Sequence, residues 1–416
     1  MQPHSGSVNT VSNMPHPPRI RYQLTDYLFW LMMLFANIPE VLTLTPIGDT
    51  MFKPYRVIAL VLCVLCLPRL LKLTPVAGRF LFLLVVALVY ALVVTALFAS
   101  QVSLFANLPL VASTFALFIA SFGVTSRSSL IIGLKCFLVS YALCAAYGIL
   151  DYNSGGYFRV AGLLENPNSM GLAASYTFLI LLNQLTPLSK TTRWVSILLL
   201  IPTVVLTGSR GSMLAVVAIY LAKAIRDPKT AIALVTLILV VFIGLPMMEE
   251  TVSDTVESHG VFKRLTMEKV EKGGAGRLAI ISRCLQVGFE HGFVGIGLGQ
   301  YKEEHHAKYF VKLNKKGEVQ KLSSHNIFAT LLTDWGAVAF ICFVLMYKGF
   351  FDASRGLKLE RDWVIGILVI TFFKGMGDDL TGEIAYWIML GVTVQLLNFT
   401  KIELERRKHM ALKNER

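Results

Sequence analysis

Charged residues are scarce in this chain of 416 residues. Asp, Glu, Lys and Arg make up only 16% of it, whereas hydrophobic residues make up 55% and the mean hydropathy is +0.61. Since a soluble domain carries about 25% charged residues, the composition excludes an ordinary soluble protein. The apolar residues also form blocks of about 17–22 residues, the length that an α-helix needs to cross a membrane. We therefore predict an all-α polytopic membrane protein.

Cysteine is also rare, and its placement argues against disulfides. Of the 6 cysteines, only Cys284 lies in a long polar segment, and the others fall inside apolar blocks. The pair Cys63-x-x-Cys66 has a redox spacing, but Val and Leu surround it and no histidine accompanies it. We interpret these cysteines as small apolar core residues. A cleavable signal peptide is not predicted either, because residues 1–24 are polar and rich in proline.

The apolar blocks predict about 12 transmembrane helices. The expected crossings lie near 25–45, 55–71, 79–98, 103–123, 130–150, 169–185, 193–207, 211–224, 230–247, 325–347, 362–376 and 383–399. This divides the chain into an N-terminal tail at 1–24, transmembrane helices 1–9 in 25–247, one long loop at 248–324, transmembrane helices 10–12 in 325–399 and a basic tail at 400–416. Within the long loop, apolar residues from Leu278 to Phe289 have the spacing of an amphipathic helix.

The distribution of basic residues predicts the orientation. If the N-terminus is cytoplasmic, 22 of the 39 lysines and arginines fall in inside segments and only 5 in short outside segments. Positive residues favour the cytoplasmic side, so we expect both termini inside and the long loop outside. Much of the net charge of +13 is then explained by anionic lipid, without nucleic acid.

Two arginines in the outside segments are candidates for anion binding. Arg210 lies in Thr207-Gly-Ser-Arg-Gly-Ser212, a short hinge that places its guanidinium beside the start of the next helix. An interfacial arginine that only anchors the helix is the plainer alternative. Arg277 follows the glycines at 273, 274 and 276, so we expect it in the first turn of the amphipathic helix, where a ligand can approach. Arg283, six residues later, faces another side of that helix.

A third arginine and one histidine share this face. For Arg159, in an earlier outside segment, a functional and an interfacial role are equally supported. His325, in Ser323-Ser-His-Asn326, begins the tenth predicted crossing and is the titratable group among these residues. An ionisable group at the end of a membrane bundle is a functional candidate, although a simple interfacial position is equally open from chemistry alone.

The other polar motifs have structural interpretations. Residues 166–169 (Asn-Pro-Asn-Ser) have the pattern of a helix cap. Gly295-Ile-Gly-Leu-Gly299 resembles a dinucleotide fingerprint only superficially, since the following helix pattern is missing. Glu303-Glu-His-His306 has no second cluster with metal-ligand spacing, which favours a solvated face. Asp378-Asp379 is interpreted as an anchor for an outer loop, so no metal site is predicted.

Four motifs in order resemble the O-antigen ligase and polymerase superfamily. They are Arg159 with Gly162 and Asn166-Pro-Asn168, then Thr207-Gly-Ser-Arg-Gly-Ser212, then Gly276-Arg277 ahead of Gly295-Ile-Gly-Leu-Gly-Gln-Tyr301, and finally Ser324-His-Asn-Ile-Phe328 followed by Asp334-Trp-Gly336. The resemblance covers roughly residues 155–345. It implies a multi-pass glycosyltransferase of the bacterial inner membrane, GT-C-like in fold, with a periplasmic active site in which 248–324 is the periplasmic loop.

The resemblance also implies the substrates and the site. The donor would be O-antigen on undecaprenyl pyrophosphate, and the acceptor a sugar hydroxyl of lipid A–core in lipopolysaccharide biosynthesis. The family's residues carry over onto His325 as the base, Arg210 as a catalytic cation, and Arg159, Arg210, Arg277 and Arg264 as the ligands of the donor pyrophosphate. No cofactor or metal is expected, and the displacement would invert the anomeric carbon.

Length and the single dominant loop favour a ligase within the superfamily. An O-antigen polymerase remains open because Arg277 and Gly288 fit a spacing of polymerases, and a protein O-oligosaccharyltransferase is the other relative. A transporter of lipid-linked glycan, a different class, would need charged residues within several crossings. The predicted crossings are nearly free of charge, which favours an enzyme.

Overall fold

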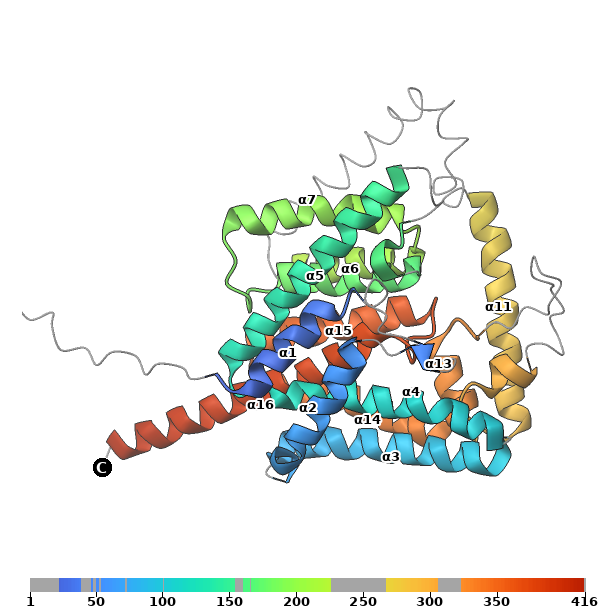
Figure 1. Cartoon of the computed structure of the whole chain (residues 1–416), viewed down its shortest axis with the longest axis horizontal. Coiled ribbons are helices and arrows are strands. Elements are labelled where there is room, and N and C mark those ends of the chain that lie inside the picture. Colours follow the sequence, from blue (N-terminus) through green and yellow to red (C-terminus); the bar gives the residue numbers. More distant parts are fainter. Residues whose placement is uncertain are drawn as a thin grey trace, which may run out of the picture.

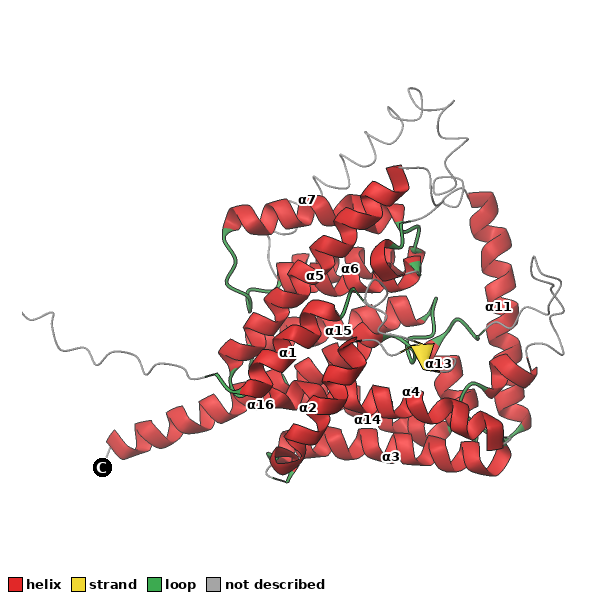
Figure 2. Ribbon diagram, viewed as in Figure 1, coloured by secondary structure: helices red, strands yellow, loops and turns green. Residues whose placement is uncertain are grey.

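The computed structural model describes residues 22–38, 46–47, 50–51, 54–71, 73–99, 101–153, 160–164, 166–225, 267–305 and 323–414. These residues form a bundle of helices with one small antiparallel ribbon, β1 (Pro46–Ile47) paired with β2 (Thr50–Met51) (Figures 1 and 2). The predicted all-helical architecture is therefore confirmed for the described residues, apart from this ribbon.

The helices coincide with the predicted apolar blocks. In the first part of the chain they are α1 (Leu24–Phe35), α2 (Pro54–Leu70), α3 (Pro75–Phe98), α4 (Gln101–Ala120), α5 (Arg127–Asn153), α6 (Pro167–Leu182), α7 (Lys190–Leu206) and α8 (Arg210–Ala224). Several start at a recognisable cap: Thr74 and Ser189 accept hydrogen bonds from the first turns of α3 and α7. The block predicted at 230–247 lies outside the described residues.

The second part of the chain contributes the long loop and the centre of the bundle. Its helices are α11 (Met267–Glu290), α13 (Ile327–Thr330), α14 (Ala337–Ala353), α15 (Lys358–Gly375) and α16 (Ile384–Asn414). Every residue of α16 from Ala385 to Asn398 is buried, and the helix packs against α3, α4, α5 and α15. A helix that is apolar on all sides belongs in a core, which is where α16 lies. Beyond the bundle it continues as an exposed polar helix (Figure 1).

The outer surface of the bundle is apolar. Large side chains on α2 and α3 are exposed, among them Val64 at 64%, Phe82 at 66% and Leu97 at 70%. Contiguous apolar surface of this kind marks contact with lipid or with another protein. Among the residues that the structure describes, two helices, Pro75–Phe98 and Arg127–Asp151, are long and apolar enough to cross a membrane, and two shorter apolar helices accompany them.

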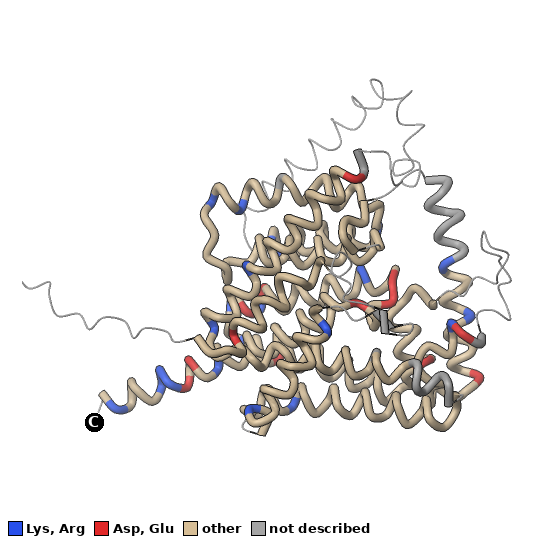
Figure 3. The backbone as a smooth tube through the Cα atoms, in the orientation of Figure 1, with Lys and Arg blue, Asp and Glu red and all other residues tan. Residues whose placement is uncertain are grey.

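Buried charge within the described residues is confined to the ends of helices. The buried ionisable side chains are Asp26 in the first turn of α1, Glu360 in the first turn of α15, Lys374 in its last turn and Asp334 in a short helix. Figure 3 shows long stretches of helix between them without charge. This pattern agrees with the prediction that the crossings are nearly free of charge.

The predicted crossing at 325–347 is not one continuous helix. Helix α13 continues into one π-helical turn, η4 (Leu331–Trp335), and stops at Gly336, after which α14 begins. Gly336 has φ +87°, and a Cβ there would lie 2.2 Å from the carbonyl oxygen of Val294. Glycine is therefore required at the break. His325 consequently precedes a short helix and does not start the long one.

The amphipathic helix of the long loop is confirmed, but its predicted start is wrong. Helix α11 begins at Met267, so Arg277 lies near its middle and not in its first turn. The glycines at 273, 274 and 276, which the sequence predicts ahead of the helix, lie inside it. Each costs about 1 kcal/mol of helix propensity relative to alanine, which lowers but does not abolish helix formation.

Candidate functional site

The glycine-rich segment at 295–301 attaches α11 to the short helix before Gly336. The backbone N–H groups of Ile296 and Gly297 donate to the carbonyls of Thr333 and Asp334 at 2.9 and 3.1 Å. Gly295 and Gly297 both have φ +105°, a conformation that side chains with a Cβ rarely adopt. The backbone of this motif is thus used for packing, in agreement with the interpretation that it is not a dinucleotide fingerprint.

A buried carboxyl group holds the same junction. Asp334 is only 5% exposed and accepts a hydrogen bond from the backbone N–H of Tyr301 at 3.1 Å. The hydroxyl of Thr333 donates to the carbonyl of Cys284 in α11 at 2.9 Å. These bonds fix α11, and with it Arg277, against the segment that carries His325.

His325 lies in a tight turn ahead of α13. Its φ is +52°, an uncommon backbone conformation for a residue other than glycine. The two neighbours fix the turn: Ser324 is hydrogen-bonded to Thr330 at 2.7 Å, and the side chain of Asn326 caps α13 through the N–H of Ala329 at 2.9 Å. The side chain of Asn326 is thus the cap of α13. The imidazole is half-buried at the end of this turn.

Three charged groups surround His325. Burial lowers its pKa below the usual value, and the positive charge of Arg277 lowers it further. The carboxylates of Asp378 and Asp379 act in the opposite direction. The net effect keeps the imidazole neutral, the form that accepts a proton.

Arg277 reaches the loop between α15 and α16. Its Nη1 donates to the carbonyl oxygen of Gly377 at 3.2 Å, and a Cβ at Gly377 would lie 3.4 Å from the same nitrogen. The side chain of Arg277 is largely exposed, so most of its guanidinium donors face solvent. Arg283 points elsewhere and lies 3.6 Å from Glu290. The preference for Arg277 over Arg283 as a phosphate ligand stays a prediction.

The two aspartates of that loop have different partners. Asp378 is ion-paired with Lys374, whose side chain is only 1% exposed. Asp379 accepts hydrogen bonds from the N–H and the hydroxyl of Thr381 at 3.0 and 2.7 Å, and burial raises its pKa. Both therefore anchor the outer loop as predicted, and both also contribute negative charge next to His325.

Arg210 is the first residue of α8, directly after the hinge predicted from its glycines. Gly208 has φ +58°, which turns the chain between α7 and α8. Gly211 lets the start of α8 approach the end of α15: a Cβ there would lie 3.1 Å from the carbonyl oxygen of Phe373. The guanidinium of Arg210 thus belongs to a helix end that packs against the backbone next to Lys374.

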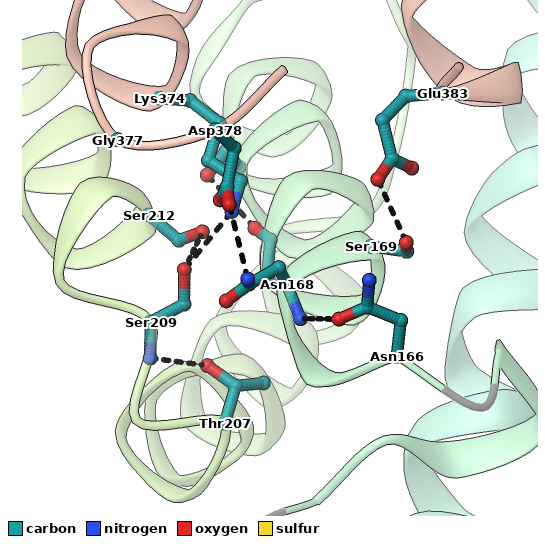
Figure 4. A network of polar contacts seen from close by, with 12 residues as sticks. Asn166, Asn168, Ser169, Thr207, Ser209, Ser212, Lys374, Gly377, Asp378 and Glu383 are labelled. Atoms are coloured by element: carbon teal, nitrogen blue, oxygen red, sulfur yellow. Dashed lines mark hydrogen bonds and ion pairs between the residues drawn. The ribbon is translucent and has the colours of Figure 1, made fainter. Parts of the chain in front are cut away.

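Figure 4 shows how Lys374 and Asp378 connect three helices. Lys374 donates to the hydroxyl of Ser209, in the hinge before α8, at 3.0 Å. Asp378 accepts from the side chain of Asn168 in the first turn of α6 at 3.0 Å. The neighbouring Ser169 donates to Glu383 at 2.8 Å. Residues from three separate sequence regions, around 168, 209 and 374–383, therefore meet in one polar network.

The predicted cap at the start of α6 is confirmed. The side chain of Asn166 accepts from the N–H of Asn168 at 2.9 Å, and Pro167 takes the first helical position. Arg159 and Arg264 lie outside the described residues. The nearest described residue to Arg159 is Val160, whose N–H donates to the carbonyl of Leu206 at the end of α7.

Sequence reasoning missed Lys374. It counted the residue among the outside basic groups and gave it no role. Two signals were available: a lysine in the last turn of an apolar helix is a functional candidate by default, and Asp378 stands four residues later, at the spacing of a helical ion pair. Within the described residues, no group of three or more His, Cys, Asp or Glu is placed to hold a metal ion.

The comparisons with known proteins identify one segment. Residues 195–344 match the model of the O-antigen ligase family, which confirms the resemblance inferred from the last three motifs. The first motif, at 159–168, lies outside the matched segment. The matched segment runs from α7 to α14 and contains Arg210, Arg277 and His325. No curated protein and no solved structure matches the chain.

Proposed function

Residues 195–344 carry the domain of the O-antigen ligase family, a superfamily of glycosyltransferase-like enzymes, and we propose that this protein is an O-antigen ligase. It would transfer a polysaccharide from undecaprenyl pyrophosphate to a sugar hydroxyl of lipid A–core. The observation that carries the proposal is His325: within the matched segment, burial and Arg277 lower the pKa of its imidazole, while the carboxylates of Asp378 and Asp379 act in the opposite direction.

The proposed location is the bacterial inner membrane, with about 12 crossings, both termini cytoplasmic and the site on the periplasmic face. The apolar outer surface of the bundle and the helix-end position of the buried charges support this arrangement. The five proposed regions keep the bounds given above: 1–24, 25–247, 248–324, 325–399 and 400–416. The exposed basic end of α16 would lie in the cytoplasm.

His325 is the proposed general base. As the acceptor hydroxyl attacks the anomeric carbon, its proton passes to the imidazole while the bond from that carbon to the pyrophosphate oxygen breaks. Asp378 and Asp379 stabilise the imidazolium that forms, as a carboxylate beside a histidine does in hydrolase triads. One displacement inverts the anomeric carbon, and undecaprenyl pyrophosphate leaves.

Arginines are proposed to hold the departing pyrophosphate. Arg277 presents exposed guanidinium donors next to His325, and Arg210 contributes from the start of α8. Two planar guanidinium groups can bind phosphate oxygens bidentately and stabilise the developing charge. Lys374 is occupied by Asp378 and Ser209, so we assign it to positioning. Arg159 and Arg264 complete the proposed set on the ground of the motif resemblance alone.

The test of this function is transfer by the purified protein in detergent. Undecaprenyl-pyrophosphate-linked O-antigen serves as donor, and rough lipopolysaccharide, the glycan itself and a serine-containing protein serve as separate acceptors. We expect transfer to lipopolysaccharide alone, and its loss in His325→Ala with normal membrane expression. Transfer to the glycan would instead make the protein a polymerase, and transfer to protein an O-oligosaccharyltransferase. Donor movement across vesicles without transfer would favour a transporter.

The role of arginines in place of a divalent cation is tested separately. Because guanidinium groups would supply the positive charge, EDTA should leave the transfer rate unchanged. A loss of activity that Mg²⁺ restores would overturn the arginine assignment without affecting the proposed reaction.

A further inference from the structure

A polar cavity lies beside the hydrogen-bond network of Figure 4. Its volume is about 170 Å³, and it is formed where the end of α1, the start of α2, the start of α6 and the start of α16 meet. The polar residues that line it are Asn37, Tyr55, Arg56, Ser169 and Glu383. Glu383 and Ser169 line the cavity and also belong to the network of Figure 4, where they are hydrogen-bonded to each other next to the loop of Asp378.

Two side chains that line this cavity are almost completely buried. Asn37 and Tyr55 are each only 1% exposed. Among the described residues, the amide nitrogen Nδ2 of Asn37 has no hydrogen-bond partner, and the hydroxyl of Tyr55 interacts with the guanidinium of Arg56. Buried polar atoms of native proteins are nearly always bonded, so the amide of Asn37 in the cavity wall requires an explanation. A ligand with hydroxyl groups would supply the partner.

The other lining groups complement such a ligand. The carboxylate of Glu383 is an acceptor, and the guanidinium of Arg56 is a donor that lies 6.0 Å from the centre of the Tyr55 ring. One positive and one negative side chain leave the lining without net charge, which does not favour a dianionic phosphate. Donors, acceptors and an aromatic ring around a small volume are suited to a neutral, polyhydroxylated ring.

We propose that this cavity is a subsite for a single sugar residue of a glycan substrate. The inference rests on the proposed function and adds to it the place where a sugar ring is recognised. The segment 377–383, which bears the carboxylates that act on His325, ends at Glu383 in the cavity wall, so one short loop connects the cavity with the groups around His325. The ring belongs either to the donor glycan or to the acceptor oligosaccharide.

Two conservative variants test the subsite without disturbing the fold. Tyr55→Phe removes only the hydroxyl, and Asn37→Leu removes the amide at similar volume. Because each variant removes at most one weak contact among the described residues, the melting temperature should change little, whereas the affinity for a glycan should fall about three- to tenfold for each lost hydrogen bond. The matched control is Tyr141→Phe, which removes another buried hydroxyl, outside the cavity.

Three binding probes identify the ligand: undecaprenyl pyrophosphate with its glycan, bare undecaprenyl pyrophosphate, and soluble core oligosaccharide free of lipid A. Weaker binding of the glycan-bearing donor alone assigns the subsite to the donor, and weaker binding of the core oligosaccharide alone assigns it to the acceptor. Equal loss for bare undecaprenyl pyrophosphate, or unchanged binding of all three, overturns the proposal. Since binding is measured without turnover, a failure of the ligase function would be seen separately, as absence of transfer by the wild-type protein.

Discussion

His325 combines an uncommon backbone conformation with a finely balanced charge environment. Its φ of +52° is held by hydrogen bonds of both neighbours, and strain retained in this way is typical of functional positions. Burial and Arg277 lower its pKa, while Asp378 and Asp379 raise it. Each neighbour can be removed singly, so the assignment of His325 as a base makes directional predictions.

The first prediction concerns pH. A base acts only when neutral, and a lowered pKa keeps His325 neutral to a lower pH. The acid limb of the transfer rate should therefore have its midpoint below the usual histidine value of about 6.5. Arg277→Gln removes a positive charge and should move the midpoint up, whereas Asp378→Asn removes a negative charge and should move it down. Pre-steady-state transfer measured between pH 5 and 8 checks both, and shifts of the same sign would contradict the base assignment.

The second prediction separates a phosphate ligand from an interfacial anchor at Arg210. Lysine retains the charge but lacks the planar fork of donors. If Arg210 binds the pyrophosphate bidentately, Arg210→Lys should lower the transfer rate by at least tenfold at normal expression. The control is Arg283→Lys, at an arginine that lies 3.6 Å from Glu290 and is given no role. Full activity of Arg210→Lys would favour the anchor.

Between elements, the ion pair of Lys374 and Asp378 connects α15 with α6 and α8. The side chains are 1% and 13% exposed, so each charge depends on its partner for solvation. Lys374→Met should destabilise the protein by about 3 kcal/mol, because a nearly buried carboxylate loses its counter-charge. The double variant Lys374→Met with Asp378→Asn should recover most of that loss. Thermal unfolding in detergent measures both, and additive losses would show that the pair is not coupled.

The helices themselves were largely predictable from the length of the apolar blocks in the sequence. An apolar run of about 20 residues leaves the backbone little choice but a helix. The errors occurred where glycine has two possible roles. At Gly336 a positive φ breaks an apolar run, whereas the glycines at 273, 274 and 276 are accommodated within α11. Sequence pattern does not distinguish these cases, because the deciding contact, such as Gly336 with Val294, comes from a distant segment.

The candidate residues of the site could be named from the sequence, but the contacts that hold them could not. The motifs singled out Arg210, Arg277 and His325, and all three lie in the segment matched by the family model. The partner of Arg277 is Gly377, 100 residues away, and Lys374 bonds Ser209, 165 residues away. Such pairings follow from how the helices pack. Asn37 was missed for the same reason, since an amide at a helix end is ordinary until its missing partner is seen.

For the whole molecule, the arrangement of charge argues for one active face. Lys374, Asp378, Arg277 and the start of α8 gather at one end of the bundle. At other helix ends Arg127 is paired with Glu360 at 2.7 Å, and Arg69 donates to the carbonyl of Gly123 at 2.6 Å. The basic groups there are thus engaged in structural bonds. At the end that carries His325, Lys374 is engaged in the same way, whereas Arg277 is exposed apart from its bond to Gly377, as expected if substrates are bound at that face.

The last prediction tests that orientation directly. Lys302 in the long loop and Lys408 in the exposed part of α16 are both exposed. In intact spheroplasts, a membrane-impermeant maleimide should label Lys302→Cys, whereas Lys408→Cys should react only after permeabilisation, because basic segments remain in the cytoplasm. The wild-type chain is the control, since four of its cysteines are buried and the other two are only partly exposed. Labelling of Lys408→Cys from outside would reverse the topology and move the groups around His325 to the cytoplasmic face, where donor and acceptor as proposed would not meet.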